Sequence, residues 1–134
     1  MAVKVKNVMV GLSALGLLIS IYLTAYHYAG VPLVCSDQGV INCANVLNSP
    51  YAVLFGVPIA VLGLVFFLAE ILVILKFKNK DWVVLYNTVG IGFVIYYIYT
   101  EYLVGSVCIY CTAVHLITLA LLIFSFSENE KIVL

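Results

Sequence analysis

The stretch Val57–Leu75 reads VPIAVLGLVFFLAEILVIL and contains a single ionisable residue, Glu70. A helix needs about 20 consecutive apolar residues to cross the hydrocarbon core of a bilayer. In lipid such a stretch must be helical, because a backbone group without a hydrogen-bond partner is costly there. The stretch therefore predicts a transmembrane helix over 57–75. Glu70 lies in its inner half, where we expect it either to snorkel toward the membrane surface or to find a polar partner.

The composition of the whole chain extends this prediction. The 134 residues are 66% hydrophobic and 9% charged, with a mean hydropathy of +1.22, whereas soluble domains are about one quarter charged. The polar side chains are too few to cover a surface that faces water. We therefore expect the lipid bilayer to surround the protein. The net charge is zero and there is no arginine or basic cluster, which argues against a nucleic-acid partner.

Three further apolar stretches lie at about 8–28, 82–104 and 107–126. The first is too long for a signal peptide and is not followed by a small-residue cleavage site, so we interpret it as a span. The fold class expected is an all-α membrane protein: a four-transmembrane-helix bundle in a single domain, 1–134, with a polar outer loop at 29–56.

The lysines indicate the orientation of these spans. All of them flank the same ends of the four helices, at Lys4, Lys6, Lys76, Lys78, Lys80 and Lys131, and the loop 29–56 has none. Because lysine-rich segments stay in the cytoplasm, we expect a multi-pass protein of the cell membrane with both termini cytoplasmic. The loop 29–56 is then extracytoplasmic.

Four cysteines form two pairs on that outer side, Cys35 with Cys43 and Cys108 with Cys111. Disulfides form and persist in such a compartment. Cys108 and Cys111 form a C-x-x-C at the start of the last span, with Ser106 expected as its N-cap. Residues three apart share a helix face, and a helix N-terminus favours the thiolate. This pattern predicts thiol–disulfide exchange.

The two pairs together suggest a relay. An exposed pair in the loop would take electrons from a soluble dithiol, and the pair at the membrane would pass them to an acceptor that dissolves in lipid, such as a quinone. Two alternatives remain from the residues alone: a non-enzymatic four-span scaffold with two structural disulfides, and a zinc site. The spacing of Cys35 and Cys43 is not that of a zinc knuckle, and no metal is expected.

The order of these residues resembles that of the vitamin K epoxide reductase family. The resemblance rests on Cys35, Cys43, Ser49, Phe55-Gly56 and Cys108-Ile109-Tyr110-Cys111, and it covers nearly the whole chain. Phe55-Gly56-Val57-Pro58 followed by Gly63 is similar to the bacterial and archaeal branch. A bacterial disulfide generator of the DsbB type has the two pairs in the opposite order.

The resemblance implies an enzyme, a quinone-dependent oxidoreductase that generates disulfides in exported proteins. Cys35 would exchange with a thioredoxin-like partner and Cys43 with Cys108, and Cys111 would face a quinone of the menaquinone, ubiquinone or vitamin K type. Ser49 would then bond a quinone carbonyl, and Phe55 would belong to the wall of the quinone pocket.

Two departures from the family pattern modify this expectation. Vertebrate members have a tyrosine where this chain has His115, which would either bond the quinone or pack on a neighbouring helix. Their asparagine early in the second helix has no counterpart here, so reduction of a quinone is expected rather than of its epoxide. A fused thioredoxin-like domain, which many prokaryotic relatives carry, is not expected, and the partner would act in trans.

The sequence leaves open the roles of several polar residues near the outer end of the third span. Glu101 is expected at the interface or bonded to the loop. Belt and pocket roles are both compatible with the tyrosines there, which are Tyr96, Tyr97, Tyr99 and Tyr102.

Overall fold

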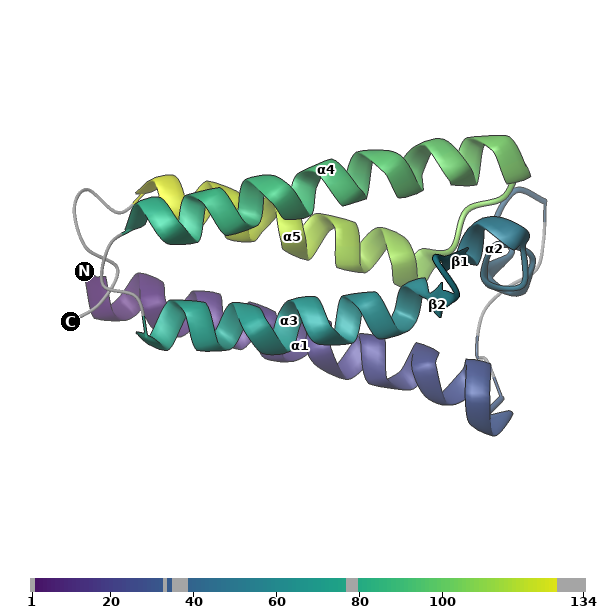
Figure 1. Ribbon diagram of the computed structural model, residues 1–134, viewed down its shortest axis with the longest axis horizontal. Coiled ribbons are helices and arrows are strands. Elements are labelled where there is room, and N and C mark those ends of the chain that lie inside the picture. Colours follow the sequence, from purple (N-terminus) through teal and green to yellow (C-terminus); the bar gives the residue numbers. More distant parts are fainter. Residues whose placement is uncertain (1, 33, 35–38, 77–79, 128–134) are drawn as a thin grey trace.

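The protein is described by a computed structural model that covers residues 2–32, 34, 39–76 and 80–127. Its four long helices form an antiparallel bundle (Figure 1): α1 (Ala2–Ala29), α3 (Ile59–Lys76), α4 (Lys80–Val104) and α5 (Ile109–Ser127). All four are long and apolar enough to cross a membrane. The prediction of an all-α bundle of four membrane spans is confirmed.

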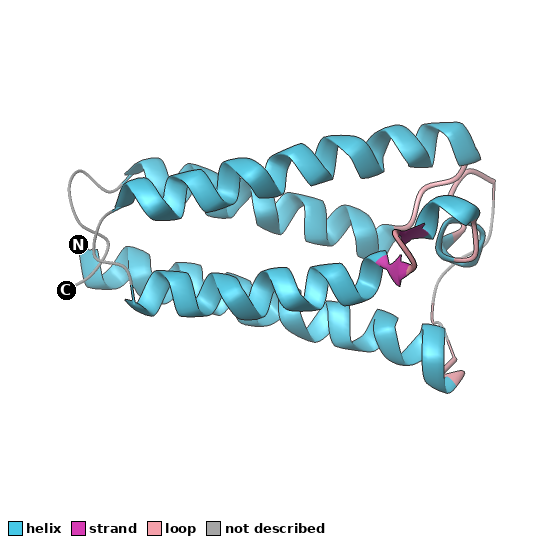
Figure 2. Cartoon of the chain, in the orientation of Figure 1, coloured by secondary structure: helices cyan, strands magenta, loops and turns pink. Residues whose placement is uncertain are grey.

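A small cap covers one end of the bundle (Figure 2). It consists of the helix α2 (Cys43–Leu47), the 3-10 turn η1 (Pro50–Ala52) and a hairpin of β1 (Val53–Leu54) and β2 (Val57–Pro58). The side chain of Asn42 caps α2 by accepting the N–H of Asn45. The start of α1, the end of α3 and the start of α4 lie at the other end, so Lys4, Lys6 and Lys76 gather away from the cap.

Close contacts at small residues set the register of the helices. A Cβ added at Gly16 would meet the ring of Phe67, and one added at Gly63 would meet Ser20 Oγ. Gly90 of α4 likewise lies against Thr118 of α5. Small residues allow such close approach of helices in a membrane. In this antiparallel register Leu23, Ala60, Tyr97 and Cys111 belong to one layer at the capped end.

A second polar layer lies deeper in the bundle. Asn87 Nδ2 of α4 donates to Glu70 Oε2 of α3 over 2.8 Å, and both side chains are fully buried. The polar partner expected for Glu70 is therefore Asn87. Below them Met9, Ile74 and Val83 complete a buried apolar core.

Candidate functional site

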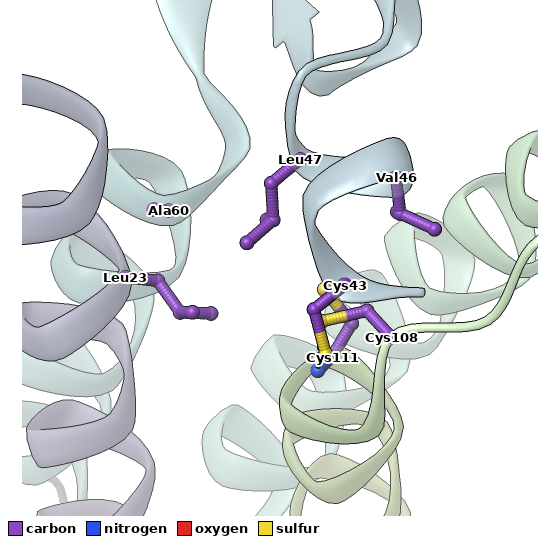
Figure 3. Packing of buried hydrophobic residues seen from close by; sticks show 7 residues of the cluster. All are labelled: Leu23, Cys43, Val46, Leu47, Ala60, Cys108 and Cys111. Atoms are coloured by element: carbon purple, nitrogen blue, oxygen red, sulfur yellow. Dashed lines mark hydrogen bonds between the residues drawn. The ribbon is translucent and has the colours of Figure 1, made fainter. Parts of the chain in front are cut away.

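Three cysteines meet beneath the cap. Cys43 of α2 and Cys108 and Cys111 at the start of α5 are all buried, in a cluster with Leu23, Val46, Leu47 and Ala60 (Figure 3). Cys43 is disulfide-bonded, while Cys108 and Cys111 are free thiols. Cys35 lies outside the described residues. The structure thus brings Cys43 together with Cys108 and Cys111, which lie 65 and 68 positions further along the chain, and buries all three.

The backbone fastens the outer loop to the start of α5. The N–H of Asn42 donates to the carbonyl of Val107 over 3.0 Å, and the N–H of Val107 donates to the carbonyl of Val40 over 2.8 Å. Asn45 Nδ2 adds a bond of 2.7 Å to Ser106 Oγ. Because Asn42 precedes Cys43 and Val107 precedes Cys108, these bonds hold the two cysteines beside each other.

The C-x-x-C forms the first turn of α5, although not with the cap expected. The helix begins at Ile109, so Cys108 occupies the N-cap position, and its Sγ accepts the backbone N–H of Cys111 over 3.5 Å. Ser106 was expected at this position. It lies two residues before the N-cap position, and its hydroxyl instead accepts a hydrogen bond from the side chain of Asn45.

The environment of Cys108 favours its thiolate. A hydrogen bond from the Cys111 thiol lowers the pKa of the Cys108 thiol below its usual range, and the amides of Cys111 and Tyr110 act in the same direction. Burial and the nearby carboxyl group of Glu101 oppose them. A cysteine with a lowered pKa is suited to exchange, because the thiolate is the nucleophile.

Aromatic hydroxyl groups hold the chain just before Cys35. Tyr22 of α1 donates to the carbonyl of Pro32 over 2.8 Å and accepts the N–H of Val34 over 3.0 Å. Tyr110, inside the C-x-x-C, donates to the carbonyl of Val34. The rings of Tyr22 and Tyr110 meet edge to face, with centroids 5.4 Å apart. The segment before α2 therefore contacts both Val107, just before the C-x-x-C, and Tyr110 within it.

A cavity of about 380 Å³ lies inward from Cys111, within the range of small-molecule sites. Its polar lining consists of Ser20, Tyr86, Tyr97, Cys111, His115 and Thr118, and the remainder is apolar. From Cys111 to Thr118 the helix rises about 10 Å at 1.5 Å per residue. The cavity is long enough for an aromatic ring system and its substituents.

One polar group in this cavity has no partner. The hydroxyl of Tyr97 is buried and has no hydrogen-bond partner among the described residues, and it belongs to the same layer as Cys111. His115 lines the cavity one turn further in. The sequence left Tyr97 undecided between belt and pocket, since nothing in YYIYTEY (96–102) distinguishes one ring from the next. The helix register decides.

The cavity opens toward the side of the bundle. Val65 of α3 and Val89 and Phe93 of α4 line it, and all three side chains are about half exposed. Their exposed faces lie on membrane-spanning helices.

Two residues that the resemblance places at the quinone, Phe55 and Ser49, do not line this cavity. Phe55 is 94% exposed at the turn of the hairpin, with φ of 53°, next to Gly56 with φ of 80°. Two positive φ values form the type I′ turn that joins two strands tightly, and this turn keeps the ring out of the cavity. Ser49 Oγ donates to the carbonyl of Val46 over 2.8 Å within the cap. The cavity wall is formed without either residue.

Within the described ranges, no three side chains of His, Cys, Asp or Glu gather as they would around a metal ion. A comparison with curated proteins finds no match. A family model described as "Vitamin K epoxide reductase family" matches residues 7–126, which include the cap, the cysteine cluster and all the cavity-lining residues. The chain therefore belongs to the vitamin K epoxide reductase family, a family of membrane oxidoreductases.

Proposed function

We propose that the protein oxidises dithiols of exported proteins and reduces a membrane quinone. The observation that carries this proposal is the free thiol of Cys111 at the outer end of a cavity that opens toward lipid and also contains His115 and the unpartnered hydroxyl of Tyr97. A thiol, two hydrogen-bonding groups and an apolar wall are what a quinone ring requires.

The proposed relay has three exchanges. A partner dithiol reduces the disulfide of Cys35 and Cys43. The Cys43 thiolate then attacks Cys108 of an oxidised Cys108–Cys111 pair, which forms a Cys43–Cys108 disulfide and releases the Cys111 thiol. Cys35 next attacks Cys43 and releases Cys108, which restores the loop disulfide and leaves Cys108 and Cys111 as thiols. That dithiol becomes a disulfide again by giving two electrons and two protons to the quinone, which becomes the hydroquinone.

The surroundings of Cys43 and Cys108 support the second exchange. Both are buried in one cluster, and the hydrogen bonds that Val107 makes with Asn42 and Val40 hold them at the same level. Positioning of this kind turns an encounter between two thiols into an intramolecular step. The lowered pKa of Cys108 is also suited to its role as leaving group, because a more acidic thiol leaves faster.

Groups of this chain would orient the quinone. Tyr97 and His115 would each donate a hydrogen bond to a carbonyl oxygen and stabilise the negative charge that develops there. Cys111 would lie against the ring. A menaquinone, ubiquinone or vitamin K type ring would enter between α3 and α4 and leave its isoprenoid tail among the half-exposed side chains at the rim.

The topology proposed has the lysine-rich end in the cytoplasm and the cap outside. Both termini are then cytoplasmic, and the cysteines face the compartment where exported proteins acquire disulfides. The electron donor would be a separate thioredoxin-like protein acting in trans. A scaffold with two structural disulfides has less support, because Cys108 and Cys111 are both free thiols.

The test uses purified full-length protein in lipid nanodiscs with dithiothreitol as donor and a short-chain quinone as acceptor. The native protein should reduce the quinone, which is followed as loss of the quinone absorbance, and Cys111→Ala should not. Cys43→Ala should keep this activity but lose turnover driven by reduced thioredoxin. A scaffold would reduce no quinone in any form. Supplying the epoxide instead tests the alternative activity, with quinone as its product.

A further inference from the structure

Glu101 of α4 is hydrogen-bonded to the start of α5 and the turn before it, through both its side chain and its backbone carbonyl. Its side chain is buried, and Oε2 accepts the backbone N–H of Cys108 over 3.0 Å. Its carbonyl accepts the N–H groups of Gly105 and Ser106. Gly105 has φ of 82°, the left-handed conformation that ends a helix and turns the chain. One residue therefore ties the end of α4 to the residue that carries the first thiol.

The side chain of Glu101 replaces a group that α5 lacks. A helix start often has an acid at the third helical position, which bonds the N–H of the N-cap residue. In α5 the N-cap is Cys108 and the third helical position is Cys111. Because Cys111 is one of the redox thiols, that position has no carboxyl group, and Glu101 supplies it from the preceding helix.

The position of Glu101 has an electrostatic consequence. Amides at a helix N-terminus stabilise a thiolate, and the N–H of Cys108 is one of those amides. A carboxylate on this N–H adds negative charge beside the sulfur that would otherwise become negative. The charge of Glu101 acts on the thiols of both Cys108 and Cys111.

We infer that Glu101 is a positioning residue that fixes Cys108 at the start of α5 and makes the reduced Cys108–Cys111 pair less stable. This inference rests on the proposed function. A cysteine pair whose reduced form is strongly stabilised is a strong oxidant, and in its dithiol form it gives up electrons less readily. By opposing that stabilisation, Glu101 favours the disulfide, and so favours transfer of two electrons and two protons from the two thiols to the quinone.

The test compares Glu101→Gln with the native protein in nanodiscs, without quinone and without partner. Glutamine keeps an oxygen that accepts the N–H of Cys108, but it removes the charge. The rate at which iodoacetamide alkylates Cys108 near pH 7, followed by mass spectrometry, should rise roughly three- to tenfold, since one unit of pKa is tenfold in thiolate. In a glutathione redox buffer, the equilibrium of the pair should shift toward the dithiol by a similar factor.

Glu70→Gln is the matched control, because Glu70 is a buried glutamate of α3 bonded to Asn87 in a deeper layer. It should leave both readouts unchanged. Glu101→Asp keeps the charge and should keep the native alkylation profile. If the glutamine variant does not fold, the aspartate variant still tests the inference. An unchanged profile in Glu101→Gln, an equal shift in Glu70→Gln, or a thiolate-rich profile in Glu101→Asp would overturn the inference.

The readouts separate this inference from the proposed function. Neither alkylation nor the glutathione equilibrium uses a quinone. If the native protein does not reduce quinones while the alkylation shift is found, the proposed function fails and the role of Glu101 stands. If quinone reduction is found without the shift, the inference alone fails.

Discussion

The backbone N–H of Asn42 donates to the carbonyl of Val107 over 3.0 Å. This bond joins the residue before Cys43 to the residue before Cys108, although the two lie in different loops. The hydrogen bond from Asn45 to Ser106 lies beside it and strengthens the same contact. The distance between Cys43 and Cys108 is therefore set by the cap as well as by the bundle.

Asn45→Ala should weaken this contact. The bond of 2.7 Å to Ser106 Oγ is lost, and a hydrogen bond contributes about 1 kcal/mol. We expect quinone reduction driven by reduced thioredoxin to slow about fivefold, while reduction driven by dithiothreitol stays the same. Asn48→Ala, which removes an exposed bond to Tyr26, is the control, and equal slowing in both variants would contradict the role of Asn45.

Cys111→Ala should make Cys108 less reactive at neutral pH. The hydrogen bond from the Cys111 thiol is the main cause of the lowered pKa of Cys108, so its loss raises that pKa toward the ordinary value. At a pH below the pKa, each unit by which the pKa of Cys108 rises reduces the fraction of Cys108 present as thiolate about tenfold. The curve of alkylation rate against pH should move to higher pH. Cys111→Ser keeps a donor and should move it less, and an unmoved curve in the alanine variant would refute this cause.

Tyr97→Phe should weaken quinone binding without disturbing the fold. The hydroxyl has no hydrogen-bond partner in the part of the chain that the structure describes, so its removal leaves no group there unsatisfied. We expect kcat/KM for a short-chain quinone to fall roughly three- to tenfold, the equivalent of one hydrogen bond. Tyr96→Phe changes a partly exposed neighbour that does not line this cavity. If it has the same effect, Tyr97 does not bond the quinone.

Gly16→Ala should destabilise the bundle. A Cβ at Gly16 would lie 2.6 Å from the ring of Phe67, which is fully buried. Overpacking of this kind costs about 1–3 kcal/mol, and thermal unfolding in detergent should occur at lower temperature. Gly11→Ala is the control on the same helix, because none of the described residues has an atom within 4 Å of its added Cβ. A native melting temperature in Gly16→Ala would mean that α1 and α3 are not packed this closely.

Phe55→Asn tests the place of this ring outside the cavity. Asparagine tolerates positive φ better than phenylalanine, so stability should rise by up to about 1 kcal/mol. The KM for quinone should not change, because Phe55 is 94% exposed and does not line the cavity. A large increase in KM would instead place Phe55 at the quinone.

The local pattern was sufficient for much of this protein. Unbroken apolar stretches predict helical spans wherever they occur, because lipid offers no partner for a free backbone group. The short helix of the cap also follows from local signals, since Asn42 caps it by a bond to the third residue after it. The spacing of Cys108 and Cys111 places both on one helix face whatever the rest of the fold.

Other features depend on contacts between residues far apart in the chain. Tyr97 and Glu101 lie among other polar and aromatic residues of one helix. Their surroundings follow from the register of α4 against α5, in which Gly90 lies against Thr118. Phe55 was expected in the pocket, but the pairing of Leu54 with Val57 turns it outward. A sequence determines a helix through neighbours a few residues apart, whereas the composition of a site depends on close packing between helices, which only the folded bundle decides.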